Sequence, residues 1–123
     1  MIGPVSVIKL GTHLIVTIHD EMSDSQILEM QEQIATTIEE SGAEGLLLDV
    51  SLLDVVDSFM GHTLNQLAAI ARLMGTRTVV VGLRPGVAIT LIELGLELPY
   101  IHTALDVEQG LELLRESNGR ARA

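Results

Sequence analysis

The feature that most constrains the fold of this chain is the nearly continuous aliphatic run from Gly45 to Val50. A run of this length and composition is typical of a central strand that is covered on both faces. A short acidic turn follows, and Ser58 stands where the apolar spacing predicts the start of a helix. A helix start carries unpaired backbone N–H groups and partial positive charge. The sequence therefore predicts a buried strand that leads into an anion-favouring helix start.

The whole chain predicts one α/β domain with a mostly parallel or mixed sheet, an N-terminal hairpin and about four helices. Alternating apolar residues and turn residues place the strands at 5–10, 13–18, 45–50, 78–81 and 100–102. Helical spacing places the helices at 25–41, 58–74, 87–96 and 107–117. We expect this domain to occupy residues 1–117, with a flexible tail at 118–123.

The charge of the chain argues against several classes of partner. The 123 residues include 17 acidic and seven basic side chains, a formal net charge of −10. Such a surface repels nucleic acids and anionic lipids, so we expect neither as a partner. No apolar segment reaches the roughly 18 residues of a membrane span, no secretory signal is visible and cysteine is absent. These features fit a cytoplasmic protein without disulfides.

No catalytic, metal or nucleotide motif is recognisable. His62 lies one helical turn after Ser58, but the pattern G-x-S-x-G is missing and Asp57 is not placed to orient that histidine. Acidic residues at strand ends usually form turns and caps, so we expect no metal at Asp49, Asp54, Asp57, His13 or His19. Both phosphate-binding glycine patterns are absent, so we expect no cofactor. The loop that contains Arg84 leaves a small anion or nucleotide site as an alternative.

Two features remain open on pattern alone. Ser58 is either an ordinary helix N-cap, worth about 1 kcal/mol, or the acceptor of a phosphate. The helix expected from Val87 to Leu96 is apolar on almost every side. Such a helix requires burial on more than one side. Either a partner covers its outer side, or the helix lies under the N-terminal hairpin.

A known family resembles this pattern. The segments Leu48-Asp49-Val50-Ser51 and Asp57-Ser58-x-x-Gly61 resemble the signature of STAS domains, the anti-sigma-factor-antagonist fold, which commonly reads L-D-L-S and then D-S-S-G. The order of elements and the Gly-Leu-x-Pro loop are also similar, over nearly the whole chain. Phe59 and Met60 depart from the simple antagonists and favour the stressosome scaffold subtype, a STAS domain without an N-terminal sensor module.

The resemblance implies a non-enzymatic scaffold or antagonist in a stress-signalling, partner-switching pathway. It implies that a serine kinase phosphorylates Ser58, that a cognate phosphatase removes the phosphate, and that the unmodified assembly holds the kinase. It also implies co-assembly with a STAS-containing sensor paralogue and self-association in a large assembly. The partner-docking residues would be Asp57, Phe59, Met60, Gly61 and His62. A simple antagonist that binds one anti-sigma kinase is the alternative.

Overall fold

The computed structural model describes residues 6–19, 22–95 and 101–122, and within them strands and helices follow the predicted order. The strands are β1 (Ser6–Leu10), β2 (His13–His19), β3 (Gly45–Leu52), β4 (Arg77–Val81) and β5 (Ile101–Ala104). The helices are α1 (Asp24–Ser41), α2 (Ser58–Leu73), α3 (Pro85–Glu93) and α4 (Val107–Arg122). The predicted α/β class, with a hairpin and four helices in the described residues, is confirmed.

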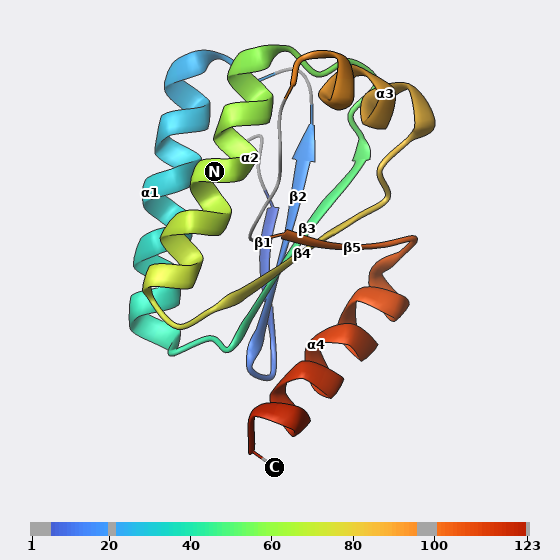
Figure 1. Cartoon of the computed structure of the whole chain (residues 1–123). Helices are drawn as coiled ribbons and strands as arrows, with labels where there is room; N and C mark the ends of the chain where they lie inside the picture. The colour runs from blue at the N-terminus through green and yellow to red at the C-terminus, as the bar shows by residue number, and fades with distance from the viewer. Residues whose placement is uncertain (1–5, 20–21, 96–100, 123) are drawn as a thin grey trace.

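The five strands form one mixed sheet in the order β1-β2-β3-β4-β5. β1 pairs with β2 in antiparallel fashion, and the other three pairs are parallel. β3 therefore lies in the centre, and its residues from Gly45 to Leu48 are all buried. Because parallel strands end at the same edge, the loops after β3 and β4 share one end of the molecule. That end carries the starts of α2 and α3 (Figure 1).

Two apolar layers hold the sheet between helices. On one face α1 and α2 pack side by side over the larger layer (Figure 1). On the other face α4 covers a smaller layer that is centred on Leu47, Val79, Val81 and Leu114. Gly110 lets α4 approach the sheet, because a Cβ atom there would lie 2.8 Å from side-chain atoms of both Leu47 and Val81. β3 is thus covered on both faces, as its composition predicts.

Some boundaries differ from the prediction. α3 begins at Pro85 rather than at residue 87, because proline is favoured in the first helical turn. It ends at Glu93, before Gly95, whose φ of 70° ends the helical path. The backbone of α4 is helical up to Arg122, where the sequence predicts a tail from residue 118. The predicted strand residues Val5 and Tyr100 lie outside the described residues.

Gly82 fixes the loop that joins β4 to α3. Its φ is 76°, and an added Cβ would lie 2.8 Å from the Ser51 Cβ and 3.1 Å from the Ser51 Cα. Gly75 has a similar φ of 79° but open space around it. We expect Gly75→Ala to lose about 1–2 kcal/mol from backbone strain, and Gly82→Ala to lose about 2–4 kcal/mol because a clash is added. Urea unfolding of both variants measures the difference, and equal losses would contradict the close contact with Ser51.

Candidate phosphorylation and docking site

The loop between β3 and α2 is anchored from inside the fold. Leu53 and Val56 are 0% and 2% exposed and belong to the core, whereas Val55 between them is 74% exposed. The Leu53 backbone N–H also donates to the Val50 carbonyl oxygen at 3.0 Å. Two buried anchors in five residues fix the path of the loop. The start of α2 is therefore presented in a defined position at the end of the sheet.

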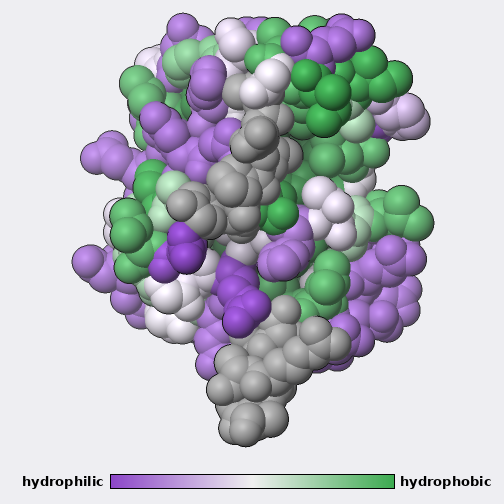
Figure 2. Space-filling model, viewed as in Figure 1, coloured by the Kyte–Doolittle hydropathy of each residue, from purple (hydrophilic) through white to green (hydrophobic). Residues whose placement is uncertain are grey.

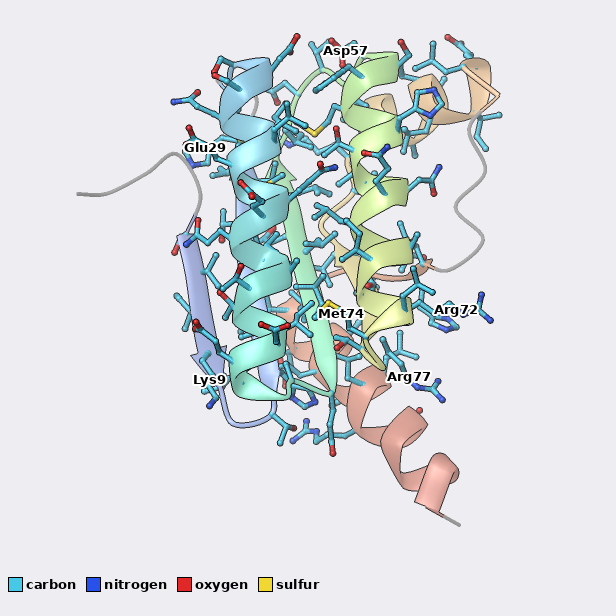
Figure 3. The ribbon with its side chains drawn as sticks, turned by 90° about the vertical axis from the view of Figure 1, so that its left-hand side faces the viewer. Lys9, Glu29, Asp57, Arg72, Met74 and Arg77 are labelled. Atoms are coloured by element: carbon cyan, nitrogen blue, oxygen red, sulfur yellow. The ribbon has the colours of Figure 1, made fainter. Side chains whose placement is uncertain are left out.

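Asp57, and not Ser58, caps α2. The backbone of Asp57 is extended, with φ −93° and ψ 176°, and its carboxylate Oδ1 accepts the Met60 backbone N–H at 2.8 Å. Figure 3 shows Asp57 at the end of α2 remote from Arg72 and Arg77. Ser58 is the first helical residue and is exposed. The interpretation of Ser58 as the N-cap is therefore wrong: both residue types cap well, and the cap lies one position earlier.

This assignment predicts unequal effects of two neighbouring substitutions on stability. Asp57→Ala removes the cap and should lower the free energy of unfolding by about 1 kcal/mol. Ser58→Ala should leave it within about 0.5 kcal/mol, because an exposed side chain without a capping role is lost. Thermal unfolding measures both, and the first change corresponds to a melting temperature about 4 °C lower. A larger loss of stability in Ser58→Ala than in Asp57→Ala would indicate that Ser58 caps α2.

The predicted docking residues divide into two groups. Phe59 is 39% exposed and His62 is exposed, so both present side chains to solvent beside Ser58. Met60 is only 6% exposed and Gly61 is buried. Burial of Gly61 favours a packing role over close approach by a partner backbone. Met60 is nevertheless one of the residues that line a groove at the start of α2.

A groove of about 410 Å³ lies between the starts of α1 and α2. Most of its lining residues are apolar, but polar atoms make up more of its exposed surface than apolar atoms, and one carboxylate lies at the start of each helix. The lining residues are Met22, Asp24, Ile27, Val55, Asp57, Phe59 and Met60. Ser58 lies between Asp57 and Phe59 in sequence and is exposed, but it is not itself one of the lining residues. The site therefore combines an exposed serine with a neighbouring groove that presents both apolar side chains and two acidic groups.

Sequence reasoning missed the half of the groove that α1 provides. α1 is capped by Ser23, whose side chain accepts the Gln26 backbone N–H while the Gln26 side chain accepts the Ser23 N–H. This capping box fixes where α1 begins and so places Asp24 and Ile27 opposite α2. Helical spacing within the range 25–41 predicts that Ile27 lies on the buried side of this helix. It contained no signal that α1 and α2 start at the same end with a groove between them.

The Arg84 side chain is already engaged by other groups of the protein and is not free to bind an anion. Its guanidinium forms an ion pair with Asp54, and its Nε donates to the Ser51 carbonyl oxygen at 3.0 Å. Arg84 thereby ties the start of α3 to the loop that precedes Ser58. Both members of the pair are more than half exposed, so the pair contributes little stability. This geometry favours a positioning role over the predicted anion site.

The outer side of α3 presents apolar side chains to solvent. Val87 and Leu91 are buried, whereas Ile89, Ile92 and Leu94 are 59%, 76% and 44% exposed. Figure 2 shows apolar surface gathered over α3 at the same end of the molecule as the groove. Burial under the hairpin does not account for these three residues. The exposure of these three side chains favours the alternative in which a partner covers the outer side of α3.

The described residues contain no group of three or more histidine, aspartate or glutamate side chains that could hold a metal ion. In the same part of the chain, each helix is too short or too polar to cross a membrane.

A model of the STAS domain family matches residues 4–110. This chain belongs to the STAS domain family. Two solved structures share its fold with 34% sequence identity and a TM-score of 0.82. One is RsbS S58E of Moorella thermoacetica, with 97% of this chain and 98% of that chain covered. The other belongs to the stressosome, described as a signal integration and transduction hub, with 92% and 98% covered. The resemblance to STAS domains of the stressosome scaffold subtype is confirmed.

One relative with a similar sequence is longer than this chain. The RsbT co-antagonist protein RsbRA of Bacillus subtilis (strain 168) is 25% identical over 91 residues. The match covers 74% of this chain and 33% of RsbRA, so this STAS domain spans about a third of that relative.

Proposed function

We propose that this STAS domain is a non-enzymatic, phosphorylation-controlled scaffold of a stressosome-type pathway. In its unmodified form it holds a serine kinase at the groove beside Ser58. Phosphorylation of Ser58 by that kinase releases it, and a cognate phosphatase resets the scaffold. The observation that carries this proposal is the exposed Ser58 at the start of α2: Asp57 caps the helix in its place, and both sequence neighbours of Ser58 line a groove.

A phosphate on Ser58 would be tolerated by the fold. Backbone N–H groups and the helix dipole at the start of α2 favour a phosphoserine by roughly 1–2 kcal/mol. Asp57 opposes it: at a separation of ~6 Å, two added charges against one cost roughly 1–1.5 kcal/mol in a water-like dielectric. The two contributions nearly cancel. Phosphorylation should therefore leave the domain folded and act on whatever docks over Ser58.

The chemistry of the groove explains why a phosphate would release a partner. Five of the seven lining residues are apolar, so a partner that binds there buries apolar side chains together with the two carboxylates. A doubly charged phosphate on Ser58 would lose hydration where a partner covers it, and this loss would oppose binding. The exposed side of α3 offers further apolar contact at the same end. Release then follows from desolvation without a change of fold.

The relatives support the assembly part of the proposal. One similar structure belongs to the stressosome, and RsbRA is described as a co-antagonist of RsbT. We infer that this chain co-assembles with a longer STAS-containing sensor paralogue and with copies of itself, in the cytoplasm. A simple antagonist that binds one anti-sigma kinase is the second candidate, favoured by the family itself. The molar mass of the purified complex by light scattering separates the two candidates.

The test of the proposal is capture of the serine kinase that is encoded nearest to this chain. The immobilised STAS domain should retain the kinase with a non-hydrolysable ATP analogue and lose it with ATP. Retention that is the same with both nucleotides would contradict release by phosphorylation. A titration of the isolated domain with nucleotides should give no heat, whereas saturable heat would favour the small-ligand alternative at Arg84.

A further inference from the structure

The loop that leads from β3 to Ser58 is held on its solvent side by a residue of the next loop. Arg84, between β4 and α3, donates through Nε to the Ser51 carbonyl oxygen at 3.0 Å, and its guanidinium also pairs with the Asp54 carboxylate. One planar group thus contacts two points of the loop that are three residues apart. We call these two contacts the Arg84 clamp.

The backbone that carries Arg84 is itself fixed. Pro85 begins α3 and restricts the residue before it to extended backbone, and Arg84 has φ −75° and ψ 149°. Gly82 lies so close to Ser51 that an added Cβ would be 2.8 Å from the Ser51 Cβ. The Arg84 carbonyl oxygen accepts the Ala88 backbone N–H at 3.0 Å. The arginine side chain therefore starts from a defined position and loses little freedom when it reaches the neighbouring loop.

Stability of the fold does not account for the Arg84 clamp. The side chains of Arg84 and Asp54 are 54% and 63% exposed, and exposed ion pairs contribute little to the free energy of unfolding. The clamp instead restricts solvent-facing residues of the loop, such as Val55, which is 74% exposed and lines the groove. Restricting an exposed segment in advance reduces the entropy that is lost when a partner binds it. The contacts therefore bear on the surface that a partner meets.

We propose that Arg84 is a positioning residue for the phosphorylation of Ser58, acting through Ser51 and Asp54. This inference rests on the proposed function and adds a residue that controls its central step. In that step the Ser58 Oγ forms a bond to the γ-phosphorus of ATP, the bond to ADP breaks, and the hydroxyl proton passes to a base of the kinase. The attacking and leaving oxygens must lie roughly in line, so the loop and the start of α2 have to be presented together.

The expected signature is a change in the KM for the STAS domain. Without the Arg84 clamp, only a fraction of the molecules has the loop in the arrangement that the kinase engages. The apparent affinity falls by that fraction. Once the kinase has docked, the groove and the core hold the loop, so the kcat of transfer stays the same. A role in direct contact with the reacting atoms would lower kcat instead.

Steady-state phosphorylation by the serine kinase encoded nearest to this chain measures both constants. We expect Arg84→Gln to raise KM about fivefold and to keep kcat within about 1.5-fold. Arg77→Gln is the matched control, because it removes the same charge from an exposed arginine at the opposite end of the sheet (Figure 3). Its KM should stay within about 1.5-fold of the wild type. Equal KM values in the two variants, or a lower kcat at unchanged KM in Arg84→Gln, would overturn the proposal.

A double-mutant cycle separates the Arg84 clamp from direct contact between Arg84 and the kinase. Asp54→Asn breaks the ion pair but keeps the contact with Ser51, so its KM should rise about twofold. The double variant should have the same KM as Arg84→Gln alone, because both changes remove one shared contact. Effects that multiply in the double variant would show that Arg84 acts independently of Asp54 and would overturn the positioning role.

Hydrogen exchange of the isolated chain, followed by NMR, tests the Arg84 clamp without a kinase. The backbone N–H groups of Ser51 and Leu53 donate to neighbouring residues in the clamped segment. Their exchange should be about fivefold faster in Arg84→Gln and unchanged in Arg77→Gln, at equal melting temperatures. Unchanged exchange in Arg84→Gln would overturn this inference alone. A wild-type chain that gains no phosphate from the active kinase would overturn the proposed function and the positioning role with it.

Discussion

Ser58→Ala should convert the scaffold into a permanent trap for its kinase. The variant keeps the Asp57 cap, the groove and the exposed side of α3, so binding of the unmodified form should be unchanged. It lacks the hydroxyl that accepts the phosphate, so ATP should no longer release the kinase. We expect the bound fraction after ATP to equal the bound fraction before it, whereas the wild-type chain loses most of its kinase. Immobilised domain and quantified kinase in the supernatant measure both values.

Ser58→Asp is the companion variant. An aspartate carries one negative charge where a phosphate carries nearly two, so this variant should bind the kinase more weakly than Ser58→Ala and more strongly than the phosphorylated chain. This order of affinities is the control that links retention of the kinase by Ser58→Ala to the charge at position 58. Normal release from Ser58→Ala on addition of ATP would contradict the switch, because the kinase would then leave for a reason unrelated to Ser58.

Val55→Asp should abolish capture of the kinase without unfolding the domain. Val55 is 74% exposed at the wall of the groove, so its replacement costs little stability. In the complex the new carboxylate would be buried against apolar partner surface with no paired group, and such burial is strongly unfavourable. We expect the dissociation constant to rise at least about 30-fold. Surface plasmon resonance with the kinase as analyte measures this change.

The matched control is Leu73→Asp. Leu73 is 88% exposed and lies at the opposite end of α2, so the same type of change is made outside the groove. Its affinity for the kinase should stay within about threefold of the wild type. Phe59→Ala should weaken binding in the same direction as Val55→Asp, because it removes apolar surface from the groove. Equal losses of affinity in Val55→Asp and Leu73→Asp would show that the kinase does not bind at this groove.

The sequence predicts the architecture well because its signals are local. The aliphatic run of β3 shows that the strand is covered on both faces, and Gly11, with φ 62°, forms the hairpin turn where it was expected. The order of elements then follows from the alternation of strand and helix patterns. Boundaries are less certain where two adjacent residues both fit a role. Asp57 and Ser58 are both good caps, and only the contact with the Met60 N–H distinguishes them.

The groove could not be predicted in the same way. Periodicity shows that Ile27 faces inward, but Asp24 and Met22 reach the site only because α1 and α2 begin at the same end of the sheet. Asp54 and Arg84 are 30 residues apart, and their ion pair follows from the neighbouring ends of β3 and β4. Phe59 and Met60 look equivalent in the sequence, but the structure shows that Phe59 is 39% exposed and Met60 only 6%. Such features depend on tertiary neighbours.

The most direct test of the central claim is phosphosite mapping by mass spectrometry. The chain is incubated with ATP and the serine kinase encoded nearest to it, and the kinase is shown to be active on a second substrate. We predict one phosphate, on Ser58, in step with release of the kinase. No phosphate, or a phosphate at another residue such as Ser51 or Thr76 with Ser58 unmodified, would contradict the account.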